Sequence, residues 1–140
     1  MRVFVDTNIW VYSLDHREPD KAQFISEWLR ERVEEDEVII STQVMIELRS
    51  VLTHKLKPAY PPEDTRDALA ALAQFEVVPA HAELVRDAHE LATTARLSWF
   101  DALIAEAALR SGCEVLYSED FSHGQMLDGT LLVQNPFDAM

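Results

Sequence analysis

Four acidic side chains stand beside or inside apolar runs of the sequence, where a carboxylate needs a physical explanation. They are Asp6, Glu47, Asp101 and Asp120. A buried carboxylate loses its solvation, and neighbouring carboxylates repel one another, so such a group is unfavourable unless a cation holds it. If the fold gathers these four, a divalent metal site is the simplest explanation. A hard cation held by carboxylates is in turn typical of phosphate chemistry.

Each of the four also has an ordinary structural interpretation. Asp6 could cap a helix that follows it. Asp101 could close a capping box, since Ser98 precedes it in an S-x-x-D pattern. Glu47 could face solvent on its helix and pair with a nearby base, and Asp120 could be a turn residue after a strand. One residue alone therefore decides little, and the elements that carry the four must be considered together.

Short apolar strands alternate with helical patterns along the chain. Strands are expected over 3–5, 37–41, 75–79, 114–118 and 130–134. Helices are expected over 8–14, 19–32, 42–56, 63–73, 82–94 and 98–110, with Gly112 placed to cap the last one. In the helix over 42–56, the residues expected on the buried side are Val44, Ile46, Leu48, Val51 and Leu52. This alternation predicts βαβ units and a mostly parallel sheet with helices on both faces.

These elements give the four acids a common place. In an open parallel sheet, ligands bind outside the carboxyl ends of the strands, where the strand order reverses. Asp6 and Asp120 fall just after predicted strands, Asp101 lies in the first turn of its helix, and Glu47 lies in the first turns of the helix after the second strand. All four are therefore expected to start near one edge of the sheet.

Composition limits the class of protein. With 140 residues and 48% hydrophobic content, we expect one packed domain over 1–140. No apolar stretch of about 18 residues is present, so no membrane span is predicted. The N-terminal residues lack the long apolar region of a signal peptide, and Cys113 is the one cysteine, which together fit a cytoplasmic protein. The histidines show no metal-ligand spacing with Cys113, so a zinc site is not expected.

The net charge of −13 opposes strong electrostatic binding of nucleic acid, which requires Lys and Arg. It favours solubility or a basic partner segment. Bound metal would neutralise part of this charge, and a short run at 31–37 holds much of it. Basic and aromatic side chains near the sheet edge are expected to contact the substrate. The candidates by position are Arg49, Lys55, Lys57, Arg96, Trp99 and His123.

Four segments in order resemble PIN-domain ribonucleases, most closely the VapC-type toxins of toxin–antitoxin pairs. The segments are Val3–Asn8, Ser41–Leu48, Leu97–Ile104 and Leu116–Phe121. The resemblance covers essentially the whole chain. It implies a PIN-like three-layer α/β/α sandwich and a Mg²⁺- or Mn²⁺-dependent endoribonuclease. It also implies an RNA substrate, a cognate antitoxin whose basic or aromatic tail fills the acidic groove, and a homodimer.

By the same resemblance, Asp6, Glu47, Asp101 and Asp120 are the metal-binding and catalytic acids. Asp6 and Asp101 are expected to bind metal directly, Asp120 directly or through water, and Glu47 to bind metal or orient the attacking water. Asn8 and Ser118 are expected to support these acids, and Ser118 stands where the family usually has Thr.

Two other functions stay open at this point. The chain could be a catalytically silent PIN-like binding module, which the charge of −13 keeps in consideration. It could also be another carboxylate–Mg²⁺ phosphohydrolase. A dehalogenase-type enzyme would have the motif Asp-x-Asp after the first strand. Asn8 stands at the position of the second Asp, so the motif is not matched.

Overall fold

A six-stranded sheet forms the centre of the computed structural model, which describes residues 1–140. The strands are β1 (Arg2–Val5), β2 (Glu37–Ser41), β3 (Glu76–Val78), β4 (Val115–Tyr117), β5 (Met126–Leu127) and β6 (Leu131–Gln134). Their order is β3-β2-β1-β4-β6-β5. All neighbours pair in parallel except β5 and β6. The predicted mostly parallel sheet is confirmed, and β5 is an addition because two residues carry no periodic signal.

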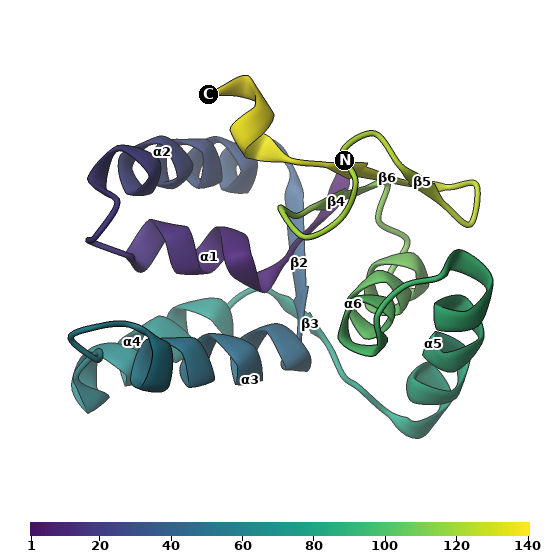
Figure 1. The fold of residues 1–140 in the computed structure, drawn as a ribbon, viewed down its shortest axis with the longest axis horizontal. Helices are drawn as coiled ribbons and strands as arrows, with labels where there is room; N and C mark the ends of the chain where they lie inside the picture. The colour runs from purple at the N-terminus through teal and green to yellow at the C-terminus, as the bar shows by residue number, and fades with distance from the viewer.

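Helices cover both faces of this sheet. They are α1 (Thr7–Leu14), α2 (Pro19–Glu35), α3 (Thr42–Ser50), α4 (Pro62–Leu72), α5 (Ala82–Ala95) and α6 (Trp99–Arg110). In Figure 1, α1 to α4 lie on one side of the sheet, and α5 and α6 lie on the other. Both α2 and α6 contact β2, from opposite sides. The α/β/α sandwich predicted from the sequence is therefore confirmed. A short 3₁₀ helix, η2 (Pro136–Ala139), ends the chain against α2.

The long helix expected over 42–56 is not one regular helix. It is α-helical to Ser50 and continues as a π-helix, η1 (Val51–Lys55), in which the Leu56 N–H donates to the Val51 carbonyl (3.1 Å). The expectation that Ile46 is buried was wrong, since its side chain is 70% exposed. Ile46 lies two residues after the buried Val44, about 200° around the helix axis, so it must point away from the core.

The end of α6 is capped as the sequence predicts. Gly112 has a φ of +74°, which lies in the left-handed region that favours glycine. Its N–H donates to the Leu109 carbonyl (3.1 Å), and the Cys113 N–H donates to the Ala108 carbonyl (3.0 Å). This pair of bonds is a Schellman motif. It ends α6 sharply and turns the chain into β4.

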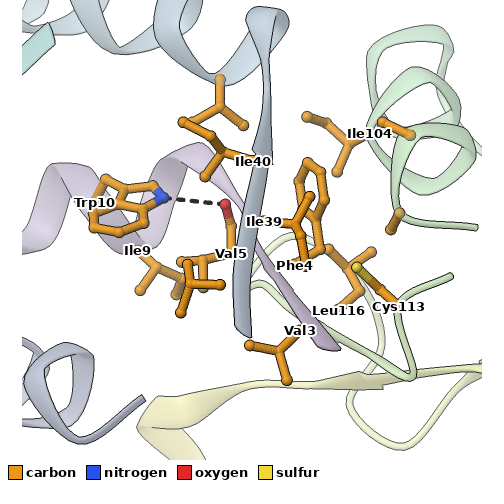
Figure 2. Close-up of a cluster of buried hydrophobic side chains, with 14 of the residues drawn as sticks. Val3, Phe4, Val5, Ile9, Trp10, Ile39, Ile40, Ile104, Cys113 and Leu116 are labelled. Atoms are coloured by element: carbon orange, nitrogen blue, oxygen red, sulfur yellow. Dashed lines mark hydrogen bonds between the residues drawn. The ribbon is translucent and has the colours of Figure 1, made fainter. Parts of the chain in front are cut away.

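The hydrophobic core surrounds β1. Val3, Phe4 and Val5 have no exposed surface. In Figure 2, Phe4 lies on the side of the sheet that faces Ile104 of α6, and Trp10 of α1 lies on the other side. The Trp10 indole N–H donates to the Val5 carbonyl (3.1 Å). The last residue of β1 is thus fixed by packing and by a hydrogen bond from α1. None of the helices combines the length and apolar character needed to cross a bilayer.

Replacing Phe4 with alanine should lower the free energy of unfolding by about 3 to 5 kcal/mol, because its buried ring fills space that neighbours cannot reclaim. Urea unfolding followed by circular dichroism measures this loss. Val33, 47% exposed on α2, supplies the control, and Val33→Ala should change stability by no more than about 0.5 kcal/mol. Equal effects of the two substitutions would contradict a core centred on β1.

Candidate active site

The strand order reverses beside β1. The chain runs outward from β1 through β2 to β3, and then returns to place β4 on the opposite side of β1. The carboxyl ends of β1 and β4 therefore lie next to each other, and the Asp6 N–H donates to the Tyr117 carbonyl (3.0 Å). Such a reversal is where open α/β sheets bind ligands.

A cavity of about 410 Å³ opens at this point. Asp6, Glu47, Asp101 and Asp120 all line it, so the structure brings the four predicted carboxylates into one cleft from four separate segments. Three further acids and two basic residues also line this acidic cleft: Asp15, Glu18, Glu119, Arg17 and Lys55. Its lining is strongly negative.

Asp6 is the most buried of the four, with 4% of its surface exposed. It is the N-cap of α1, and its Oδ1 accepts a hydrogen bond from the Thr7 N–H (2.7 Å). Its Oδ2 accepts one from the Ser118 hydroxyl (2.8 Å). Capping and a place in the cleft are therefore compatible, because each carboxylate oxygen has a different neighbour.

Ser118 and Asn8 both donate hydrogen bonds to Asp6. Ser118 is fully buried, and besides donating to Asp6 it accepts from the Asp120 N–H (3.0 Å). The Asn8 amide donates to both Ser118 Oγ (3.3 Å) and Asp6 Oδ2 (3.4 Å). Its carbonyl oxygen accepts from the Glu119 N–H (3.1 Å). This network joins the loop after β4 to the start of α1.

Glu47 is held by hydroxyl and amide groups. Its Oε1 accepts from the Thr7 hydroxyl (2.7 Å), and its Oε2 accepts from the Gln43 amide (3.4 Å). Glu47 is half-buried and forms no salt bridge, so pairing with a base does not explain it. The bond to Thr7 ties α3 to α1 across the cleft.

Asp101 is half-buried in the first turn of α6, where the Ser98 hydroxyl accepts from the Asp101 N–H (3.3 Å). The cap of α6 is therefore the Ser98 side chain, while the Asp101 carboxylate lines the cleft. Burial raises the pKa of Asp101, the Ser98 hydroxyl counteracts this, and the negative charge of Asp120 raises it further.

The neighbouring acids Glu119 and Asp120 have different surroundings. Glu119 accepts a hydrogen bond from the Tyr12 hydroxyl (2.9 Å) and lies 3.7 Å from the Lys21 ammonium. The exposed Asp120 carboxylate has no hydrogen-bond or salt-bridge partner. Asp120 is therefore the freer of the two to accept a ligand.

The surroundings of Asp6 disfavour its charged form. Burial raises the pKa of Asp6 to about 7; the Ser118 hydroxyl and the Thr7 N–H oppose this rise, and the charges of Asp120 and Glu47 add to it. A carboxylate in this position requires a proton or a cation near neutral pH.

No three His, Cys, Asp or Glu side chains are arranged closely enough to hold a metal ion. The four carboxylates thus share a cleft without forming a closed cluster. The donor chemistry fits a hard divalent cation, since every candidate ligand is a carboxylate oxygen. The raised pKa of the buried Asp6 and the unpartnered Asp120 carboxylate support the same conclusion.

Sequence reasoning missed several contributors to the cleft. The hydroxyl of Thr7 and the phenol of Tyr12 orient acids through contacts between helices, which no local pattern reveals. Among the basic and aromatic candidates for substrate contact, only Lys55 lines this cleft. Arg49 and His123 lie in other hollows.

Comparison with known proteins agrees with this geometry. The PIN domain family model matches residues 3–125. VapBC2 from Rickettsia felis, solved bound to a DNA fragment from their promoter, is similar with a TM-score of 0.69 and 21% identity, over 96% of this chain and 98% of that one. A toxin–antitoxin complex from Klebsiella pneumoniae is similar with a TM-score of 0.66 and 19% identity, over 96% and 97%.

The Mycobacterium tuberculosis toxin VapC20, described as cleaving the sarcin–ricin loop, is similar with a TM-score of 0.55 and 20% identity. This match covers 84% of the present chain and 89% of that toxin. At these identities the likenesses show a common fold. No curated protein sequence matches the chain.

Asp6→Asn should stabilise the metal-free protein at neutral pH and lose this advantage in acid. The native pKa of about 7 exceeds the ordinary 3.8, so the folded protein keeps the Asp6 proton between these values and the unfolded chain does not. Wild-type stability should therefore fall as pH rises from about 4 to about 7, by up to about 4 kcal/mol from this group. Asparagine does not ionise, so the stability of Asp6→Asn should not fall over this pH range for that reason.

Urea unfolding from pH 4.5 to 8 in EDTA measures the difference between the two proteins. Glu63→Gln, which removes an exposed acid from α4, serves as the control and should follow wild type at every pH. A constant difference between Asp6→Asn and wild type across this range would contradict the raised pKa.

Proposed function

This chain belongs to the PIN domain family, and we propose that it is a Mg²⁺- or Mn²⁺-dependent endoribonuclease, the toxin of a toxin–antitoxin pair. The main support is the shared cleft, which the buried Asp6 lines together with Glu47, Asp101 and Asp120. Four acids from distant segments meet where the fold binds ligands, and their mutual repulsion makes a cation favourable there.

Asp6 and Asp101 would hold the metal directly, with Asp120 binding it directly or through water. Glu47 would bind the metal or orient the attacking water. A divalent cation bound there supplies a water of lowered pKa and neutralises charge that develops on the scissile phosphate. The Ser118 hydroxyl keeps Asp6 Oδ2 oriented (2.8 Å), so this carboxylate does not rotate away from the cleft.

Glu47 has the surroundings that a proton acceptor needs. Its Oε1 is fixed by the Thr7 hydroxyl (2.7 Å), and the weaker contact of Oε2 with Gln43 (3.4 Å) leaves that oxygen available to a water. A general base must lie within hydrogen-bond reach of the proton it removes. The hydrogen bond from Thr7 fixes the Glu47 carboxylate in the orientation that this requires.

RNA as the substrate is supported by the fold shared with VapC20, which is described as cleaving the sarcin–ricin loop. The charge of −13 opposes RNA binding at long range. A bound divalent cation would offset this charge where the phosphate must enter.

The acidic cleft suits a basic segment of an antitoxin, and two of the similar structures are toxin–antitoxin complexes by description. Apolar side chains border the cleft. Phe100, which lines it, is 63% exposed, and its carbonyl accepts from the Gln43 amide (3.1 Å). Exposed Ile46 lies one turn beyond Gln43 on α3. These side chains would anchor the antitoxin. A homodimer is an expectation from the family resemblance, and a cytoplasmic location is an expectation from the sequence pattern.

Asp101→Asn should reduce RNA cleavage by at least about a hundredfold, because a ligand of the proposed cation loses its charge. Asp6→Asn should do the same. Total RNA incubated with Mg²⁺ or Mn²⁺ and resolved on denaturing gels measures the rate. Glu63→Gln removes one exposed acid outside the cleft and should cleave at the wild-type rate, while circular dichroism confirms that all variants fold.

Full activity in Asp101→Asn or Asp6→Asn would overturn the assigned roles. If wild type cleaves no RNA but binds Mn²⁺, the chain is a silent PIN-like binding module. If it instead hydrolyses a small phosphomonoester, it is another phosphohydrolase.

Mn²⁺ should raise the melting temperature of wild type in proportion to the logarithm of its concentration. A ligand that binds only the native state at a hundred times its Kd stabilises that state by about 2.7 kcal/mol. Asp6→Asn should lose most of this shift, because a fixed carboxylate of the site has become neutral. Differential scanning calorimetry measures it, with Glu63→Gln expected to respond as wild type does. An undiminished shift in Asp6→Asn would place the metal elsewhere.

A further inference from the structure

A second cavity adjoins the acidic cleft and differs from it in chemistry. It has a volume of about 410 Å³ and is lined by residues 14–17 and 56–61 and by Asp64. Asp15 and Arg17 line both cavities, so the two are adjacent. We call this cavity, together with Lys55 of the adjacent acidic cleft, the lysine groove.

The lysine groove lies along the least acidic part of the chain. Residues 48–62 contain no Asp or Glu and form the longest such stretch in the sequence. This stretch contributes Lys55 and Lys57, which are exposed and form no salt bridge. Arg17 is different, because its guanidinium binds the buried Asp15 through two contacts of 2.9 Å. In a protein of charge −13, the two lysines are the free cations beside the cleft.

The π-helix η1 carries Lys55 at its end, and Lys57 follows two residues later. Val51 and Lys55 line the acidic cleft, while Leu52 and Leu56 are buried beneath them. The Tyr60 N–H donates to the Leu52 carbonyl (3.0 Å), which folds the following loop back against η1. Wide turns of this kind are rare and frequently occur at functional sites.

Two aromatic rings complete the groove. His16 and Tyr60 are nearly parallel, at 9°, with 6.4 Å between their centroids. The Tyr60 hydroxyl donates to the Leu14 carbonyl (3.1 Å), which fixes the orientation of its ring. Both residues line the cavity. Parallel aromatic faces beside cations match single-stranded RNA, whose bases stack while its phosphates pair with lysine.

We propose that the lysine groove binds the nucleotide of single-stranded RNA next to the one cleaved, with His16 and Tyr60 stacking on its base and Lys55 and Lys57 contacting the flanking phosphates. The proposal rests on the proposed ribonuclease function and names where its substrate leaves the acidic cleft. It also accounts for how a strongly acidic protein holds a polyanion, through one local cationic segment.

Binding measured in EDTA separates this proposal from catalysis. The probe is a fluorescein-labelled single-stranded RNA of about 12 nucleotides and mixed sequence, followed by fluorescence anisotropy over a range of NaCl concentrations. Lys55→Ala/Lys57→Ala should weaken binding at least about tenfold and reduce the slope of log Kd against log[NaCl] by about 1.4. Arg66→Ala/Arg86→Ala removes two equally exposed, unpaired cations elsewhere and should stay within about twofold of wild type.

The rings are tested separately. His16→Ala should weaken binding at least about fivefold and leave the salt slope unchanged, since stacking carries no charge. Tyr60→Ala should behave similarly, whereas Tyr60→Phe, which keeps the ring, should bind within about twofold of wild type. His16 is exposed, so its variant remains informative even if Tyr60→Ala fails to fold.

Equal binding by the lysine pair variant and its arginine control would overturn the proposal, as would unchanged binding by His16→Ala. Failure of wild type to bind the probe would also overturn it. In cleavage assays with Mn²⁺, the lysine pair variant should raise KM and keep kcat, unlike Asp101→Asn. If wild type binds the probe but cleaves no RNA, weaker binding by the lysine pair variant would support the groove while refuting the nuclease. If wild type cleaves RNA and the lysine pair variant binds the probe as tightly as wild type, the nuclease would be supported and the groove refuted.

Discussion

The hydrogen bond from the Ser118 hydroxyl to Asp6 Oδ2 (2.8 Å) connects the two strand ends on which the site depends. It holds the Asp6 carboxylate at the boundary between core and cleft, where burial raises its pKa and the Ser118 hydroxyl and the Thr7 N–H oppose the rise, which leaves the pKa at about 7. A buried carboxylate without such donors would remain protonated well above neutral pH or rearrange. The bond therefore preserves an oriented carboxylate that a cation can use.

The core makes that arrangement rigid. β1 lies between both helical layers, with Phe4 toward α6 and Val5 bonded through its carbonyl to Trp10 of α1. Asp6 follows at once, so its backbone position is fixed on both faces of the sheet. Site residues on rigid elements keep their geometry better than those on loops. Asp120, on the loop after β4, is the exception, and it is also the most exposed of the four acids.

Much of the sandwich was predictable, because short apolar strands and helical periods are local properties of the sequence. The place of Asp6 and Asp120 at strand ends followed from the same patterns and from the rule about strand reversal. Contacts between helices were not predictable. The hydrogen bonds from Thr7 to Glu47 and from Tyr12 to Glu119 depend on how α1 packs against α3 and against the loop after β4. The π-helix that begins at Val51 was not predictable either, since its residues suit an ordinary α-helix equally well.

The contact between the Gln43 amide and the Phe100 carbonyl (3.1 Å) has a mechanical consequence. α3 and α6 belong to opposite layers, and their first turns meet over the edge of the sheet (Figure 1). This solvent-exposed hydrogen bond therefore joins two helical layers that the strands otherwise separate. Because Phe100 also lines the acidic cleft, a ligand seated against its ring would contact the pair of residues that joins the two helical layers.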